Sequence, residues 1–130
     1  MSTFPSDRRY TTDHEWAKLE GDTVVIGVST FAVEQLGDIT LVSIDAAVGA
    51  EIEVGKPFGT IESVKTLSDL LAPISGTLVA TNVELDDAPE LINDDCYGKG
   101  WMIKIKPADV HDVDQLMDSA SYDQHVKQSH

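Results

Sequence analysis

The sequence predicts a mostly β protein: a flattened barrel or sandwich of short strands, with short helices and a helical segment at its C-terminal end. Short runs of apolar residues alternate with polar residues, and glycines recur between them, as in small barrels and sandwiches. After Pro107 the apolar residues change to helical spacing. A length of 130 residues fits one domain.

The N-terminal part of the chain predicts a hairpin. Segments 14–19 and 24–28 read as two strands, and the second is rich in β-branched residues. Gly21 and Asp22 stand between them, where they favour a tight turn.

A short helix and another strand follow this hairpin. Ser29 or Thr30 can cap a helix that continues to Leu36. Gly37 stands where a helix end favours a left-handed residue. Apolar residues over 39–44 then predict the next strand.

The middle of the chain predicts a tight hairpin with a lysine at its tip. Apolar residues approach Lys65 from Ile61 and return over 67–71. A second turn at 73–76 leads into a strand over 77–81. A lysine at such a tip points away from the core, where a modifying enzyme can reach its amine.

The remaining segments predict a loop, a strand and a helical end. Segment 84–95 holds six acidic residues and no basic residue, which predicts a solvated loop with a helical turn around 90–92. The alternation over 101–106 predicts a strand with one face in the core. Apolar residues at helical spacing from Val110 to Val126 predict an amphipathic helix or two short helices.

The charge balance excludes several classes of partner. Nine basic residues stand against 23 acidic residues, so the formal net charge is -14. This surface repels nucleic acid and anionic membrane faces, and no apolar run approaches the roughly 20 residues that a membrane helix needs. The N-terminal residues resemble no signal or transit peptide, so we expect a cytoplasmic protein. A mature mitochondrial chain without its leader would fit equally well.

Neither a metal site nor a catalytic thiol is favoured. The four histidines are not paired at ligand spacing on one element. The neighbours of Cys96, Asp94 and Asp95, would raise the pKa of its thiol, so we interpret Cys96 as structural. An enzyme with its own acid and base is therefore the weaker interpretation.

Segment 62–76, ESVKTLSDLLAPISG, resembles the lipoyl-attachment segment of the glycine cleavage system H-protein family. The resemblance runs from Tyr10 to about Tyr122 and includes His14-Glu15-Trp16. Biotin carriers place the lysine between methionines, and lipoyl domains of 2-oxoacid dehydrogenases usually have an acid before it. In this chain Val64 and Thr66 flank Lys65 instead. Two positions depart from the family pattern: segment 44–49 lacks the usual Leu-Pro pair, and Cys96 stands in place of a common proline.

The resemblance implies one lipoyl-type domain over 1–130. It would comprise an N-terminal hairpin extension at about 10–28, a lipoyl hairpin core at about 38–106 and a C-terminal helical segment at about 108–127. Lipoic acid would be attached to Lys65 through an amide. Glu62, Ser63, Val64 and Asp69 would be recognised by the lipoylating enzymes.

The resemblance also implies a carrier that is not itself an enzyme. Pyridoxal-phosphate-dependent glycine decarboxylase would load an aminomethyl group onto the arm. Tetrahydrofolate-dependent aminomethyltransferase would remove it, and dihydrolipoamide dehydrogenase would reoxidise the dithiol. A cationic aminomethyl group should be held in a cleft with carboxylates or hydroxyls that excludes water. The candidates are Glu15 and Asp69, with Asp13 and Ser68 as weaker members.

Two alternatives remain open at this point. A lipoyl-relay carrier, which supplies lipoyl or octanoyl groups to other proteins or serves a paralogous redox system, needs the same modified lysine. A binding module without modification would keep Lys65 as a plain amine. The sequence shows no obvious dimer stripe, so we expect a monomer.

Overall fold

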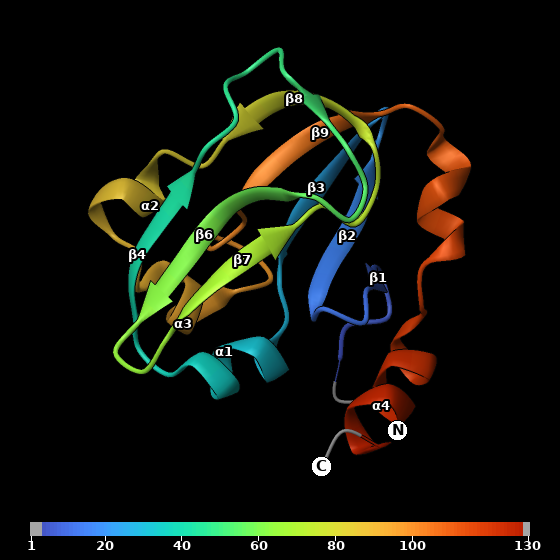
Figure 1. Ribbon diagram of the computed structural model, residues 1–130. Helices are drawn as coiled ribbons and strands as arrows, with labels where there is room; N and C mark the ends of the chain where they lie inside the picture. The colour runs from blue at the N-terminus through green and yellow to red at the C-terminus, as the bar shows by residue number, and fades with distance from the viewer. Residues whose placement is uncertain (1–3, 129–130) are drawn as a thin grey trace.

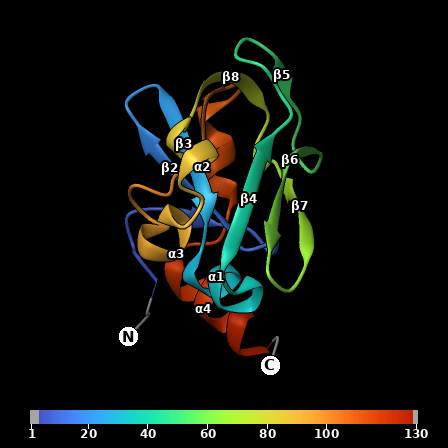
Figure 2. The ribbon, with the colours of Figure 1, turned by 90° about the vertical axis from the view of Figure 1, so that its left-hand side faces the viewer.

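The computed structural model describes residues 4–128. Two antiparallel sheets face each other, and the main apolar core fills the space between them (Figures 1 and 2). The predicted mostly β fold, with short helices and a C-terminal helix, is confirmed, and across the described residues the strands form two separate sheets rather than a closed barrel.

The larger sheet has six strands, each antiparallel to its neighbours. Across the sheet they are β1 (Arg9–Tyr10), β2 (Glu15–Glu20), β3 (Thr23–Val28), β9 (Ile103–Pro107), β8 (Gly76–Thr81) and β5 (Glu51–Ile52). The predicted hairpin is present as β2 and β3, and it turns at Gly21 with a φ of 64°. Val24, Ile26 and Ile105 of this sheet are fully buried in the core between the sheets.

The smaller sheet carries the lysine hairpin. Its strands lie in the order β4 (Ile39–Ile44), β6 (Pro57–Ser63) and β7 (Leu67–Leu71). Only residues 64–66 join β6 to β7, so Lys65 lies at the tip of the hairpin as predicted. The inward side chains Val42, Ile61 and Leu70 pack into the core, and β7 is an edge strand of this sheet.

Helix α1 (Thr30–Leu36) connects the two sheets between β3 and β4. Its predicted caps are both present: Ser29 Oγ accepts a hydrogen bond from Ala32 N–H, and Gly37 ends the helix with a φ of 80°. The hairpin tip between β6 and β7 lies beside α1 in both views (Figures 1 and 2). Helix α1 therefore lies where it can support the exposed tip.

The acidic segment 84–95 is more ordered than predicted. In place of a loop with one helical turn around 90–92, it forms α2 (Glu84–Asp87) and α3 (Leu91–Asp95). One apolar side chain anchors each helix, because Leu85 and Ile92 are both buried in the core. The acidic residues remain largely on the outside, which is why the sequence resembles a solvated loop.

The C-terminal segment is only partly helical. A 3₁₀ helix over Val110–Gln115 and helix α4 (Ser119–Gln128) flank an extended stretch at Leu116 and Met117. Of the two predicted arrangements, the pair of short helices is present, but the helical spacing wrongly included Leu116 and Met117. Met117 instead exchanges two backbone hydrogen bonds with Tyr10, of 2.8 and 3.0 Å, and so extends the sheet edge at β1.

Across the described part of the chain, the helices are too short or too polar to cross a membrane. The predicted division of the chain into one lipoyl-type domain with two extensions stays a prediction. The last few residues of a chain are expected to fray, and here they include residues 129 and 130, which lie outside the described residues.

Candidate functional site

Ser63 shapes the tip of the β6–β7 hairpin. Its Oγ accepts hydrogen bonds from the backbone N–H groups of Lys65 and Thr66, each at 3.2 Å. Its own N–H donates to the Thr66 carbonyl at 2.8 Å. Ser63 is buried, whereas Lys65 and Thr66 are exposed. The backbone of the turn is thus fixed, and the lysine side chain is presented at the surface.

The tip rests on the turn that leads from α1 to β4. Val64 N–H donates to the Asp38 carbonyl at 3.0 Å. A Cβ added to Gly37 would lie 3.3 Å from Lys65 Cε, so the lysine stem passes directly over the bare glycine backbone. Gly37 therefore serves two purposes: its φ of 80° ends α1, and its missing side chain makes room for Lys65.

Asn93 of α3 makes two side-chain hydrogen bonds to the same turn. Its Oδ1 accepts a hydrogen bond from Ile39 N–H, and its Nδ2 donates to the Gly37 carbonyl, both at 2.9 Å. This role cannot be predicted from the sequence, because 54 positions separate Asn93 from Ile39 and no local pattern connects them. An asparagine in this acidic segment predicts only a turn.

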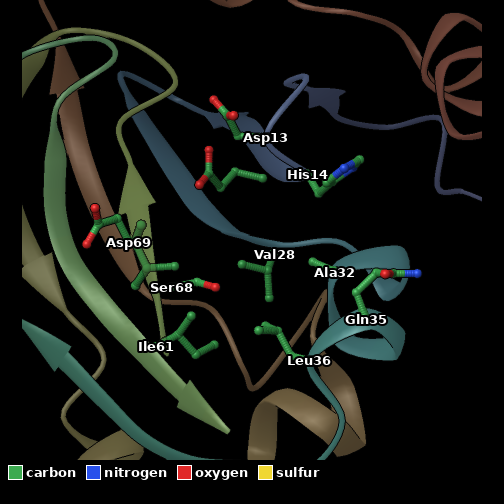
Figure 3. A pocket seen from close by; sticks show the side chains of 11 residues that line it. Asp13, His14, Val28, Ala32, Gln35, Leu36, Ile61, Ser68 and Asp69 are labelled. Atoms are coloured by element: carbon green, nitrogen blue, oxygen red, sulfur yellow. The ribbon is translucent and has the colours of Figure 1, made fainter. Parts of the chain in front are cut away.

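A cavity of about 150 Å³ lies between the start of β2, helix α1 and strand β7, and we call it the α1–β7 cleft (Figure 3). Figure 3 shows Ser68 and Asp69 on the β7 side and Ala32, Gln35 and Leu36 on the α1 side. Its apolar lining residues are Val28, Ala32, Leu36, Ile61 and Leu70, and its polar lining residues are Asp13, His14, Glu15, Gln35, Ser68 and Asp69.

The four residues that the sequence analysis named for a cleft all line this one cavity: Asp13, Glu15, Ser68 and Asp69. Ser68 is the second residue of β7 and stands three positions after Lys65 of the turn, so the cleft begins within about 10 Å of the hairpin tip. The floor of the cleft is apolar and three carboxyl groups lie along its wall. Such a lining can accept an aliphatic chain that ends in a cation.

Glu15 is the buried carboxyl group of this cleft, with a relative exposure of 3%. Its Oε2 accepts a hydrogen bond from Leu71 N–H at 3.0 Å, and its Oε1 accepts one from Thr11 Oγ1 at 3.2 Å. Burial raises the pKa of Glu15 to about 8, and the negative charge of Asp13 adds to this, while the hydrogen bonds oppose it. A cation entering the cleft would favour the ionised carboxylate.

Only one neighbour of Glu15 follows the alternation of the strand. Strand alternation predicts that Glu15 lies on the opposite face from both His14 and Trp16. Trp16 does face away and is core: its Nε1 donates to the Cys96 carbonyl at 3.0 Å. His14, however, lines the cleft together with Glu15. Its backbone is left-handed, with a φ of 71°, so the alternation of the strand does not extend to it.

The residues proposed for recognition around Lys65 differ in accessibility. Glu62, Val64 and Asp69 are exposed, and Val64 has a relative exposure of 67%. Glu62 pairs with Leu41 on one side and Leu67 on the other, both of them exposed. Ser63 is buried beneath the turn, so its contribution is to the shape of the tip.

Burial determines the state of the Cys96 thiol. Cys96 is buried, and burial, with a smaller effect of Asp95, raises the pKa of its thiol to about 11. This agrees with its interpretation as a structural residue. Within residues 4–128, no three His, Cys, Asp or Glu side chains are grouped so that they could hold a metal ion.

Comparison with known proteins gives one consistent result. The profile of the family described as Glycine cleavage H-protein matches residues 8–129. The chain belongs to this family. It is 49% identical to the glycine cleavage system H protein of Bacillus pumilus over 128 residues, covering 98% of this chain and 99% of the relative. It is 50% identical to that of Bacteroides fragilis over 119 residues, covering 92% and 94%.

The fold of the family is also seen in a solved structure. A crystal structure of a glycine cleavage system H protein from Mycobacterium marinum matches with a TM-score of 0.83 and 37% sequence identity. The match covers 96% of this chain and 98% of that one. The hairpin, the helices and the C-terminal segment described above therefore belong to an H-protein fold along nearly its whole length.

Proposed function

We propose that this protein is the lipoyl carrier of a glycine cleavage system, with lipoic acid attached to Lys65. The observation that carries this proposal is the placement of Lys65. It is exposed on a hairpin tip whose backbone is fixed by hydrogen bonds, within about 10 Å of a cleft lined by apolar side chains and carboxyl groups. Membership of the H-protein family supports it.

A lipoyl-lysine arm could fold back from the hairpin tip along β7. A lipoyl-lysine side chain reaches on the order of 12 to 15 Å from the backbone. Ser68, which lines the α1–β7 cleft, stands three positions after Lys65, so its backbone lies within about 10 Å of that of Lys65. The arm can therefore reach partner enzymes when it extends and the cleft when it folds back.

Lipoic acid attached to Lys65 would supply a disulfide that can accept two electrons and carry the aminomethyl group left when glycine loses CO₂. The chain's own residues provide the shelter. Val28, Ile61 and Leu70 offer apolar surface to the arm. Glu15, with Asp69 and Asp13 nearer the surface, offers negative charge to the cationic amine. Ser68 offers a hydroxyl to the same group.

The reactions themselves belong to partner enzymes. These are glycine decarboxylase, aminomethyltransferase and dihydrolipoamide dehydrogenase, and the lipoylating enzymes act before them. We propose that the lipoylating enzymes read the exposed Glu62, Val64 and Asp69 around Lys65, on the tip that Ser63 shapes. The net charge of -14 becomes -15 when acylation removes the charge of Lys65, and it steers each partner to a brief encounter.

The proposal is tested on protein purified from its native host. Intact mass should show the lipoyl increment on wild type and none on Lys65→Arg, which keeps the charge but offers no acylatable amine. The wild-type protein should then support exchange of bicarbonate into glycine with purified glycine decarboxylase. Wild type without the increment would contradict both carrier functions, and the increment without exchange would favour a lipoyl relay.

A further inference from the structure

The C-terminal helix reaches the wall of the α1–β7 cleft through one hydroxyl group. Tyr122 of α4 is fully buried, and its hydroxyl lies 2.8 Å from His14 Nδ1 and 2.7 Å from Ser29 Oγ. His14 precedes β2 and lines the cleft. Ser29 caps α1, which forms the opposite wall. Two walls that are distant in sequence therefore meet at a third, more distant residue.

These contacts close a ring. Ser29 N–H donates to the His14 carbonyl at 2.9 Å, while the side chains of the same two residues both bond the Tyr122 hydroxyl. Ser29 Oγ also accepts from Ala32 N–H at 3.3 Å, and Ala32 lines the cleft. The ring thus connects the backbone of both walls to one side chain of α4.

The direction of the hydrogen bonds follows from Ser29. Its hydroxyl is buried, it already accepts from Ala32 N–H, and its other contact is the oxygen of Tyr122. Ser29 therefore donates to Tyr122, and Tyr122 donates its single proton to His14 Nδ1. This requires the neutral His14 ring with its proton on Nε2. A proton on Nδ1 would reverse the relay and leave the Ser29 hydroxyl proton without an acceptor.

The surroundings of His14 agree with a neutral ring. Burial lowers the pKa of His14, and the nearby His125 of α4 lowers it further, while Asp13 has the opposite effect. Glu15 follows it in the chain, and burial favours the neutral form of that carboxyl group too. The left-handed backbone of His14, which few residues other than glycine adopt, is held in place by the same ring.

We propose that Tyr122 is a positioning residue of the α1–β7 cleft. Its hydroxyl fixes His14 against Ser29, sets the separation of the β2 and α1 walls, and so holds Glu15 beside the arm. This role rests on the proposed function, since it is the folded-back arm that the cleft shelters. It gives α4 a task beyond packing Tyr122 and Val126 into a second apolar cluster with Tyr10, Trp16 and Phe31.

Tyr122→Phe tests the role, and Tyr10→Phe is its matched control. The two rings stack on each other with centroids 4.6 Å apart, so both variants keep the same packing. Tyr122→Phe loses the bonds to His14 and Ser29. Tyr10→Phe loses one hydroxyl bond as well, but to the Pro5 carbonyl, away from the cleft. A loss caused by weaker packing of this cluster would appear in both.

The first measurement needs no lipoyl group. In the unmodified protein, NMR titration should show the pKa of His14 moving up toward 6.5 in Tyr122→Phe and staying in place in Tyr10→Phe. Exchange of the Ala32 amide should become about fivefold faster or more in Tyr122→Phe alone. An unchanged His14 titration together with unchanged Ala32 exchange would overturn the positioning role, whatever Lys65 carries.

The second measurement uses lipoylated proteins loaded with the aminomethyl group to equal extent. Formaldehyde should be released about fivefold faster or more from Tyr122→Phe than from wild type or Tyr10→Phe. His14→Gly, which keeps the left-handed backbone without strain, should give the same increase, and the double variant should add nothing. Equal release from wild type and Tyr122→Phe would overturn the inference, whereas a wild type that cannot be loaded would contradict the proposed function instead.

Discussion

The carboxylate of Glu15 joins the two sheets, because its Oε2 accepts a hydrogen bond from Leu71 N–H at 3.0 Å. Glu15 begins β2 of the larger sheet, and Leu71 ends the edge strand β7 of the smaller one. An edge strand leaves backbone groups unpaired, so this contact satisfies one of them. The same side chain thus connects the two sheets at the α1–β7 cleft, where it becomes ionised as the pH rises through about 8 or when a cation enters.

Glu15 should make the free energy of unfolding depend on pH. Its folded pKa of about 8 lies above the ordinary value of 4.5. The folded chain therefore holds the proton more tightly, so this group stabilises the fold fully below about pH 4.5, and the contribution is lost as the pH rises through about 8. The slope for one group is at most about 1.4 kcal/mol per pH unit.

Glu15→Gln isolates this effect. The free energy of unfolding of wild type minus that of the variant, from urea titrations between about pH 5 and 8, should fall steadily as the pH rises. His14, with its lowered pKa, acts with the opposite sign below about pH 6.5, but it is present in both proteins and largely cancels. A difference that is constant with pH would contradict the raised pKa.

Gly37→Ala should destabilise the fold by about 1 to 3 kcal/mol. The backbone of Gly37 has a φ of 80° and a ψ of -147°, a region that is nearly closed to other residues, and a new Cβ would press on Lys65 Cε. Gly21→Ala is the control: its φ is 64° and nothing lies within 4 Å, so about 1 kcal/mol is expected. Urea midpoints at equal slope would compare them, and equal losses would argue against the contact with Lys65.

Asn93→Ala should loosen the support of the hairpin tip. The variant removes both hydrogen bonds from Asn93 to the turn at 37–39. The Asp38 carbonyl of that turn accepts a hydrogen bond from Val64 N–H of the tip. Asn82→Ala is the control, because it removes hydrogen bonds elsewhere, including two of 2.8 Å. Each variant should lower the free energy of unfolding by about 1 to 3 kcal/mol. Native-state hydrogen exchange of the Val64 amide should accelerate in Asn93→Ala alone. Equal acceleration in both would mean that Asn93 has no special relation to the tip.

Local chemistry explains why the hairpin and α1 could be predicted. The caps of α1 at Ser29 and Gly37, and the turn around Lys65, depend on residues within a few positions of each other. The family resemblance added the chemistry of the lysine, which the turn alone does not reveal. These are the parts of the site that a short window of sequence determines.

The cleft could be predicted only as a list of residues, because contacts across the chain create it. The bond from Leu71 to Glu15 spans 56 positions, and that between Tyr122 and His14 spans 108. The left-handed backbone of His14 ends the strand alternation for a local reason, because His14 N–H donates to the Thr11 carbonyl at 3.1 Å in a turn before β2, while the distant Tyr122 contacts only its ring. Met117 is extended rather than helical because its backbone N–H and C=O groups form hydrogen bonds with the backbone of Tyr10.

Glu62→Gln should lower the rate of lipoylation of Lys65 without changing the fold. Glu62 is exposed, three residues before the lysine, between the exposed side chains of Leu41 and Leu67. The variant removes one charge from the face that a lipoylating enzyme must approach. Intact mass over time would follow modification, with Glu51→Gln as the control for losing an exposed acid elsewhere. Equal rates in both variants would contradict recognition of Glu62.

Salt should weaken partner encounters more than it weakens folding. The lipoylated carrier has a formal charge of -14 - 1 = -15, so attraction to basic partner faces acts over a distance that salt shortens. The Debye length falls from about 10 Å at 0.1 M to about 3 Å at 1 M. The KM for the carrier in glycine decarboxylation and in dithiol reoxidation should therefore rise several-fold over this range, mainly through slower association.

Folding responds differently because its main contributions are short-range. The fold depends on buried apolar side chains between the two sheets, and salt does not screen these contacts. Screening also reduces the self-repulsion of the acidic surface, so the urea midpoint should stay or rise while the KM increases. Carrier KM values that stay constant from 0.1 M to 1 M salt would exclude electrostatic steering and leave short-range contacts around the Lys65 hairpin as the basis of partner recognition.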